Sequence, residues 1–154
     1  MKDKLIKICS HPCAGKTTYI NKIKHLINPD IYKLHDQDRV KQQWKKNQLL
    51  LIEKNRTVLF FGSEKTGDLG TSLSKDVIYI VVVPPYDEIV RNAKKRKDNN
   101  EQPKWKELSD IIPARERLIY WAGLNNFKLY PSFDILFNSD KNGKVIFNSG
   151  LTAI

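Results

Sequence analysis

The sequence predicts an α/β fold with a mainly parallel sheet, on the basis of three observations. Apolar stretches of strand length alternate with stretches of helical periodicity along the chain. Residues 77–83 form a continuous apolar run, which is typical of a strand buried on both faces of a parallel sheet. A short loop containing Gly15-Lys16-Thr17 joins the first predicted strand to the first predicted helix, the context in which a loop binds phosphate.

The first half of the chain is predicted to hold three strands and two helices. Short apolar runs rich in β-branched and aromatic residues indicate the strands, and apolar residues at helical spacing indicate the helices. The predicted elements are a strand at Leu5–Cys9, a helix over 19–27, a strand at 31–35, a helix over 38–53 and a strand at 57–61. The second strand leads directly into Asp36.

The second half begins with the strand at 77–83, which Pro84 and Pro85 end. The elements predicted after it are a helix from Tyr86 or Asp87, a loop at 99–103, a helix over 108–123, and strands at 133–138 and 144–147. Between the last two strands, residues 140–143 read Asp-Lys-Asn-Gly, a strong hairpin turn. We therefore expect a single domain over 1–154, with a three-layer P-loop kinase fold. Its sheet has five mainly parallel strands and helices on both faces, and the final hairpin adds an antiparallel edge.

The loop after the first strand carries the predicted nucleotide-binding residues. Its backbone N–H groups and the start of the following helix would face phosphate oxygens. Lys16 would reach the β- and γ-phosphates of ATP, and the Thr17 hydroxyl would hold Mg²⁺. The residues predicted to bind the nucleotide here are Ser10, Cys13, Ala14, Gly15, Lys16, Thr17 and Thr18. Ser10 stands where such loops usually have their first glycine, so the loop must open without that freedom.

Composition and charge indicate which classes of partner to expect. The formal net charge of +10 favours a polyanionic partner such as nucleic acid, or a phosphorylated small molecule; a basic surface that only aids solubility is the alternative. Lysines interrupt the N-terminal apolar run, and no apolar run is long enough to span a bilayer, so we expect a cytoplasmic protein without a membrane partner. Cys9, Cys13 and His11 supply only three candidate ligands inside a phosphate loop, which argues against a zinc site.

Asp36 is the candidate general base. In an open parallel sheet the carboxyl ends of the strands line the ligand crevice, and both Lys16 and Asp36 follow such ends. A carboxylate there can accept the proton of an acceptor hydroxyl, and Arg39 can hold a nearby phosphate. A helix N-cap is the alternative role for Asp36, and Asp38 is an equal candidate for that cap.

A basic segment at about 91–106 is the candidate lid over the transferring phosphoryl group. It contains seven Lys or Arg and two Asp or Glu residues. Arg91 and Lys95 lie four residues apart and share a helix face, so they could clamp phosphates; a solvated basic surface is the alternative. On the next helix, Arg115 or Arg117 could approach the ATP base or phosphates, or form a surface ion pair with Glu116.

These residues resemble the kinase domain of phage-type polynucleotide kinases. The resemblance rests on residues 10–17, on Asp36-Gln37-Asp38-Arg39 and on residues 83–95, which include Arg91-Asn92-Ala93-Lys94-Lys95. It implies an ATP- and Mg²⁺-dependent kinase in which Asp36 is the base, Arg39 binds the acceptor phosphate, and Arg91, Lys95 and Arg96 belong to the lid. Ser10 and Cys13 replace glycines of the family, and no phosphatase domain follows. A related phage group phosphorylates hydroxymethyluracil in DNA.

Three functions are compatible with these residues. The first is an ATP-dependent kinase acting on a hydroxyl of nucleic acid, either the 5′-hydroxyl of DNA or RNA or the hydroxymethyl group of a modified uracil in DNA. The second is a nucleoside monophosphate kinase, in which Arg39 and Arg91 hold a small acceptor and the loop at 62–70 closes over it. The third is a nucleotide-dependent nucleic-acid-binding module, which would need Lys16 and Thr17 but not Asp36 with Arg39. The net charge favours a polymeric substrate.

Overall fold

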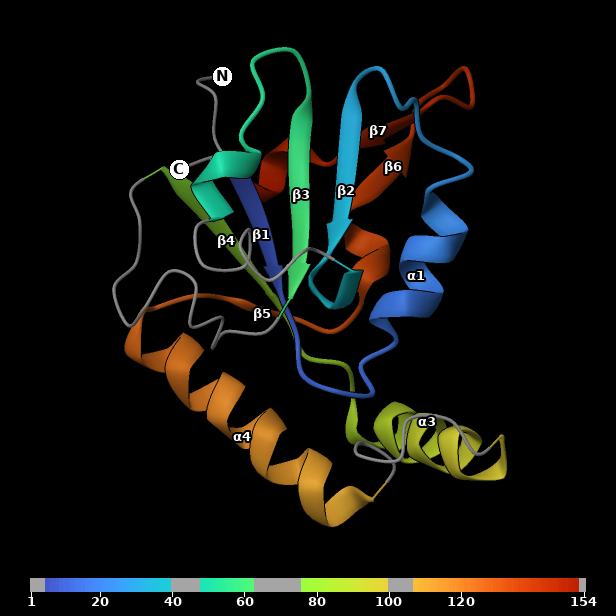
Figure 1. Ribbon diagram of the computed structural model, residues 1–154, viewed down its shortest axis with the longest axis vertical. Helices are drawn as coiled ribbons and strands as arrows, with labels where there is room; N and C mark the ends of the chain where they lie inside the picture. The colour runs from blue at the N-terminus through green and yellow to red at the C-terminus, as the bar shows by residue number, and fades with distance from the viewer. Residues whose placement is uncertain (1–4, 40–47, 63–75, 100–106, 153–154) are drawn as a thin grey trace.

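The computed structural model describes residues 5–39, 48–62, 76–99 and 107–152. Its main feature is a five-stranded parallel sheet in the order β2-β3-β1-β4-β5 (Figure 1). The strands are β1 (Leu5–Cys9), β2 (Tyr32–Asp36), β3 (Thr57–Gly62), β4 (Val77–Val82) and β5 (Leu129–Tyr130). The predicted α/β class and the mainly parallel five-stranded sheet are confirmed.

The central strand β1 is buried along its whole length. It pairs in parallel with β3 on one side and with β4 on the other, so Ile8 lies beside both Phe61 and Ile80. The apolar run of β4 is buried at its carboxyl half, in agreement with the prediction of a strand covered on both faces. The parallel register places the carboxyl ends of β1, β2 and β3 at one edge of the sheet, the lower edge in Figure 1.

One face of the sheet is covered by α1 (Lys16–Ile23) and by the C-terminal segment. Ile8 of β1, Phe61 of β3 and Val82 of β4 belong to this core cluster. Tyr19 of α1 packs in the same cluster, and its ring stacks on Phe133 with the centroids 5.5 Å apart. This packing fixes the start of α1, and with it the loop that leads from β1.

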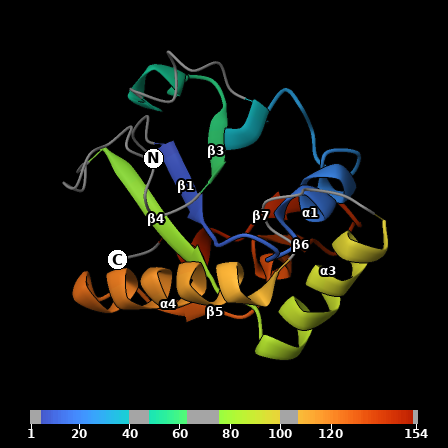
Figure 2. The same ribbon diagram turned by 60° about the horizontal axis from the view of Figure 1, so that its bottom comes forward.

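The opposite face is covered mainly by α4 (Leu108–Leu124). Leu118 and Ala122 of α4 pack with Val81 of β4 in a second core cluster. Nearer the start of the strands, Phe60 packs with Leu51 of the 3₁₀ turn η2 (Gln48–Leu51). Figure 2 shows α4 and α3 (Tyr86–Asp98) as separate helices near the edge where β1 and β4 end. Helical segments therefore pack on both faces of the sheet, as predicted.

The C-terminal part differs from the prediction in three ways. The fifth parallel strand is β5, a two-residue edge strand beside β4 that the sequence analysis missed. The first half of the strand predicted at 133–138 is instead the 3₁₀ turn η3 (Phe133–Ile135), because the Ser132 hydroxyl caps it at Asp134 N. The predicted hairpin is present, but its strands β6 (Phe137–Ser139) and β7 (Val145–Phe147) form a separate two-stranded sheet and not an edge of the main one.

The hairpin turn itself is confirmed. The Asp140 carboxylate accepts hydrogen bonds from the N–H groups of Asn142 and Lys144, both at 2.9 Å. Gly143 has φ of 78°, a conformation that favours glycine. The short 3₁₀ turn η4 (Ser149–Leu151) follows β7.

Two helix predictions in the first half need correction. The helix predicted over 19–27 begins earlier, at Lys16, and ends at Ile23. After Ile23 the chain tightens into a turn, in which Leu26 N and Ile27 N both donate hydrogen bonds to Ile23 O. Of the helix predicted over 38–53, the described ends are 3₁₀ turns, η1 (Gln37–Arg39) and η2, and residues 40–47 lie outside the described part.

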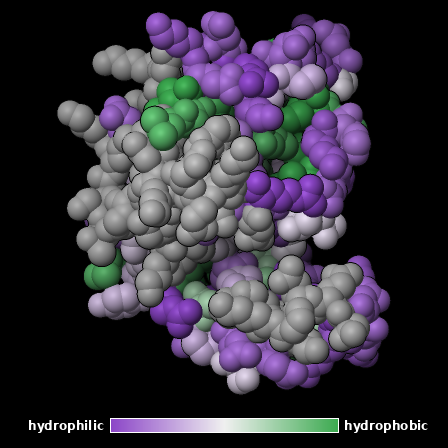
Figure 3. Space-filling model, viewed as in Figure 1, coloured by the Kyte–Doolittle hydropathy of each residue, from purple (hydrophilic) through white to green (hydrophobic). Residues whose placement is uncertain are grey.

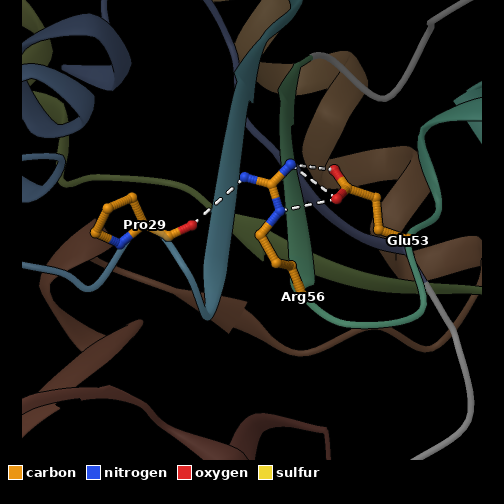
Figure 4. Close-up of polar contacts among 3 residues, drawn as sticks. All are labelled: Pro29, Glu53 and Arg56. Carbon is orange, nitrogen blue, oxygen red and sulfur yellow. Dashed lines mark hydrogen bonds and ion pairs between the residues drawn. The ribbon is translucent and has the colours of Figure 1, made fainter.

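Arg56 joins the starts of β2 and β3 (Figure 4), at the edge opposite to the loop between β1 and α1. Its guanidinium donates two hydrogen bonds of 2.8 Å to the Glu53 carboxylate and one of 3.4 Å to Pro29 O. Thr57 N also donates to Ile31 O at 2.8 Å. These contacts stabilise the register in which β2 places Asp36 at the other end of the sheet.

Among the described residues, none of the helices is long and apolar enough to cross a bilayer.

Candidate functional site

The candidate site begins with the loop between β1 and α1. Ser10 N donates a hydrogen bond of 2.8 Å to Gly62 O at the end of the neighbouring strand β3. Ser10 and His11 are each only 4% exposed. Ser10 is not among the described residues with positive φ, which are Cys13, Gly15, Asn126 and Gly143. The loop therefore opens by a hydrogen bond to β3 and does not need the glycine that usually stands at position 10.

Two residues in the left-handed region curl the loop. Cys13 has φ of 65° and Gly15 has φ of 90°. Left-handed residues set between ordinary ones turn successive N–H groups toward one side, which makes an anion-binding concavity. Gly15 adopts this conformation without steric cost, whereas Cys13 carries a side chain and needs support from its surroundings.

The loop runs into the N-terminus of α1. Gly15 is the N-cap, no side chain caps the helix, and its first turn contains no acidic residue. The first N–H groups of an α-helix have no partner within the helix, and the helix dipole makes this end positive. Thr17 and Thr18 are exposed in this first turn. The arrangement suits a phosphate group, and the Thr17 hydroxyl is accessible to a metal ion that accompanies it.

Lys16 and Asp36 meet at this site. Lys16 Nζ lies 3.1 Å from Asp36 Oδ1, and the two side chains are 17% and 7% exposed. Since β3 lies between β1 and β2, this ion pair crosses the carboxyl end of β3. The sequence analysis placed both residues at strand ends facing one crevice, and the structure brings them into direct contact.

Of the predicted lid, the part on α3 is described. Asn92 and Arg96, one turn apart, lie toward the loop. Asn92 Nδ2 donates a hydrogen bond of 2.8 Å to Cys13 O. Burial raises the pKa of the Cys13 thiol, and the nearby Arg96 charge opposes this only in part. Arg91 and Lys95 are exposed beside this face. The hydrogen bond from α3 to the loop is made by Asn92, and a role of Arg91 and Lys95 as a lid stays a prediction.

Arg39 is exposed at the end of η1, three residues after Asp36. Within the part of the chain that the structure describes, the Arg39 side chain makes no hydrogen bond or ion pair, so only its place in the chain brings it near the site. The side chain of Asp38 lies outside the described residues. The loop predicted at 62–70 lies outside them beyond Gly62, as do the lid residues from 100 to 106.

Arg115 approaches the loop from α4. Its Nη2 donates to Pro84 O at 3.3 Å, after the end of β4, and its charge acts on His11. Arg117, the other candidate on this helix, is exposed. Arg115 Nε is a buried atom without a hydrogen-bond partner in the described part of the chain.

His11 is a functional candidate that the sequence analysis considered only as a zinc ligand. The structure pairs its Nδ1 with Pro12 O at 2.8 Å, which fixes the proton of the neutral ring on Nδ1. Burial lowers the pKa of His11 to about 4; the Pro12 hydrogen bond opposes this, and the nearby Arg115 charge adds a smaller lowering. The ring is therefore neutral at pH 7. The presence of a histidine in the loop after the first strand was the only signal in the sequence, and that signal does not reveal that the side chain is buried.

This lowered pKa predicts a loss of stability in acid. Because the folded pKa is about 4 and the unfolded value is 6.5, the unfolded state binds a proton first, and stability falls as the pH drops from 6.5 toward 4. Between pH 7.5 and pH 5 the difference amounts to about 2 kcal/mol in the free energy of unfolding. Denaturant unfolding of His11→Gln should show a pH dependence that is smaller by about this amount.

His25→Gln is the control for the acid effect, since His25 is exposed. His35, whose pKa is also lowered by burial, remains in both variants and contributes equally. An acid loss that is unchanged in His11→Gln would show that His11 is protonated as easily in the folded chain as in the unfolded one.

No protein-family model and no curated protein match this chain in the comparisons with known proteins. The resemblance to polynucleotide kinases stays a prediction.

Proposed function

We propose that this protein is an ATP-dependent kinase that transfers the γ-phosphoryl group to a hydroxyl of a nucleic acid. The single observation that carries the proposal is the Lys16–Asp36 contact of 3.1 Å beside the uncapped start of α1. Lys16 is a cation that could bind phosphate, Asp36 is a carboxylate that could accept a proton, and the two side chains are in direct contact. A nucleotide-binding module has no chemical need for the carboxylate.

The proposed roles follow from the position of each residue. The loop N–H groups and Lys16 would bind the β- and γ-phosphates, so Lys16 exchanges its carboxylate partner for a phosphate oxygen. Asp36 would then accept the proton of the attacking hydroxyl. Thr17 would be the protein ligand of Mg²⁺, which neutralises phosphate charge when it is bound. Arg39 would hold a phosphate of the acceptor.

The lid residues would supply positive charge that balances the negative charge of the phosphates. The exposed cations Arg91 and Lys95 on α3 lie beside the loop through the contact between Asn92 and Cys13. Positive groups that close over the transferring phosphoryl group stabilise the charge on its oxygens. The strand order with β1 at the centre supports the proposal of a three-layer P-loop kinase fold. Cytoplasmic location remains part of the same proposal.

A polymeric acceptor is favoured by the surface of α3. The last turn of α3 carries Lys95, Arg96 and Lys97, and the coloured atoms at lower right in Figure 3, where this helix lies, are mostly hydrophilic. Lys97 forms an ion pair of 2.8 Å with Glu107, so its charge is partly balanced. Lys94 and Lys95 are exposed, on a helix that contacts the phosphate loop.

The function is tested by incubating the protein with labelled ATP and a panel of acceptors. The panel contains DNA and RNA with 5′-hydroxyl ends, DNA with hydroxymethyluracil, and nucleoside monophosphates. Label on a polymer supports the proposal, and the acceptor that is labelled identifies the hydroxyl. Label on monophosphates alone would indicate a nucleoside monophosphate kinase, and ATP-dependent DNA binding without label would indicate a binding module.

The double variant Lys94→Gln/Lys95→Gln should bind DNA less tightly and with a weaker dependence on salt. Each phosphate contact that is lost should lower the slope of log affinity against log salt by about 0.7 to 0.9, because fewer counterions are released. The measurement is a fluorescence titration of labelled DNA at several salt concentrations.

The matched control is Lys141→Gln/Lys144→Gln, which removes the same charge from the exposed hairpin turn. Equal slopes in the two double variants would show that the charge of α3 acts only through the net charge of the protein.

A further inference from the structure

The contact between α3 and the phosphate loop is made by one side chain. Asn92 Nδ2 donates to Cys13 O at 2.8 Å, although the two residues are 79 positions apart. The same nitrogen would lie 3.9 Å from a Cβ built on Gly15. The Asn92 amide therefore reaches both of the left-handed residues that curl the loop.

The peptide between Cys13 and Ala14 is held at both of its polar atoms. Its carbonyl accepts from Asn92, and its N–H donates to His11 O at 3.3 Å. With the carbonyl turned toward α3, its oxygen points to a donor on the lid helix. A carbonyl released from Asn92 could turn its lone pairs toward the phosphate position, where they would repel an anion.

Cys13 depends on α3 for its side chain as well. The left-handed region is disfavoured for a residue with a Cβ, so Cys13 requires compensating contacts. The Cys13 side chain is 2% exposed and packs with Ile89 and Ala93 of α3 and with Ile111 of α4. Ile89, Asn92, Ala93 and Arg96 share the face of α3 that lies toward the loop.

We propose that Asn92 is a positioning residue: it holds the Cys13–Ala14 peptide so that the phosphate loop is in its anion-binding shape before the nucleotide arrives. The inference rests on the proposed function, because it takes the anion to be the phosphate chain of ATP. It also assigns a second role to α3. Besides carrying Arg91 and Lys95, the helix would keep the loop in shape through Asn92, which lies near its middle.

The test compares Asn92→Asp and Asn92→Ala with the wild type. Asp keeps the size of the side chain, but it has no N–H to donate and sets a carboxylate oxygen against Cys13 O; Ala removes the group without adding charge. We expect both variants to bind ATP and inorganic pyrophosphate at least about tenfold more weakly by calorimetry. We also expect KM for ATP to rise more than kcat falls. Asp110→Asn, exposed in the first turn of α4 and outside the lid segment, is the control and should change neither affinity.

Thermal unfolding is measured in parallel, since a contact that only supports the fold would lower Tm and leave pyrophosphate affinity unchanged. Affinities within twofold of the wild type in either folded Asn92 variant overturn the inference. Lys16→Ala distinguishes a failure of the role proposed for Asn92 from a failure of the proposed function. If Lys16→Ala loses ATP binding while the Asn92 variants keep it, only the role of Asn92 fails. If the wild-type protein binds neither ATP nor pyrophosphate, the proposed function fails, and the role of Asn92 fails with it.

Discussion

Lys16→Ala is expected to abolish measurable phosphoryl transfer from labelled ATP. The side chain is 17% exposed and starts at the first residue of α1, so its charge acts in a partly dry site beside the loop. Loss of one preorganised donor to developing charge typically slows a reaction by about 10²- to 10³-fold, and Lys16 would supply a full positive charge as well. The measurement is the initial rate of label transfer to the acceptor identified in the panel.

Lys22→Ala is the matched control for this prediction. Lys22 lies on the same helix and forms an ion pair of 3.2 Å with Asp134, but the two side chains are 59% and 69% exposed. Such a surface pair contributes at most about 1 kcal/mol, and the Lys22 variant should keep its activity. Circular dichroism confirms that both variants are folded. A folded Lys16→Ala protein with turnover close to that of the wild type would exclude the kinase proposal.

Asp36→Asn should reduce turnover by about 10²- to 10⁴-fold, the usual cost of losing a general base. Asn keeps the size of the side chain at this buried strand end but cannot accept the hydroxyl proton. Since Asn caps a helix about as well as Asp, a role as an N-cap alone predicts that activity survives. The measurement is kcat on the true acceptor, together with the affinity for ATP, which should change little because the loop and Lys16 remain.

Asp134→Asn is the control, because it removes the carboxylate of the exposed Lys22 ion pair and changes the net charge by the same amount as Asp36→Asn. The pH dependence of the rate adds an independent readout, since the limb that reports the base should be missing in Asp36→Asn. If Asp36→Asn keeps most of the wild-type rate, Asp36 is only the resting partner of Lys16 and the base is another group.

Much of the site could be predicted because it lies in short stretches with strong local signals. The loop from Ser10 to Gly15 follows a mainly apolar strand that is buried along its whole length, and Gly15 is followed directly by the helix. The hairpin turn at Asp140 is equally local, because its side chain bonds within four residues. In each case the residues that predict the element are neighbours along the chain.

Elements without such signals were predicted incorrectly. The strand β5 has two residues, too few for any periodicity, and exists because Leu129 and Tyr130 pair with β4. Phe133 looked like a strand residue because it is apolar and aromatic. Its ring stacks on Tyr19, and the Ser132 cap turns its backbone into a 3₁₀ turn. Tertiary packing and capping override propensity at these positions.

The sequence by itself determined the α/β class, the parallel sheet and the placement of Lys16 and Asp36 at strand ends, since strand-length apolar runs and turn residues act locally. Only the tertiary structure decided that Lys16 and Asp36 touch across β3, that Asn92 holds the loop, and that burial makes His11 neutral. Each of these depends on the distance between segments far apart in the chain, or on the exclusion of water. Neither quantity can be read from the order of residues.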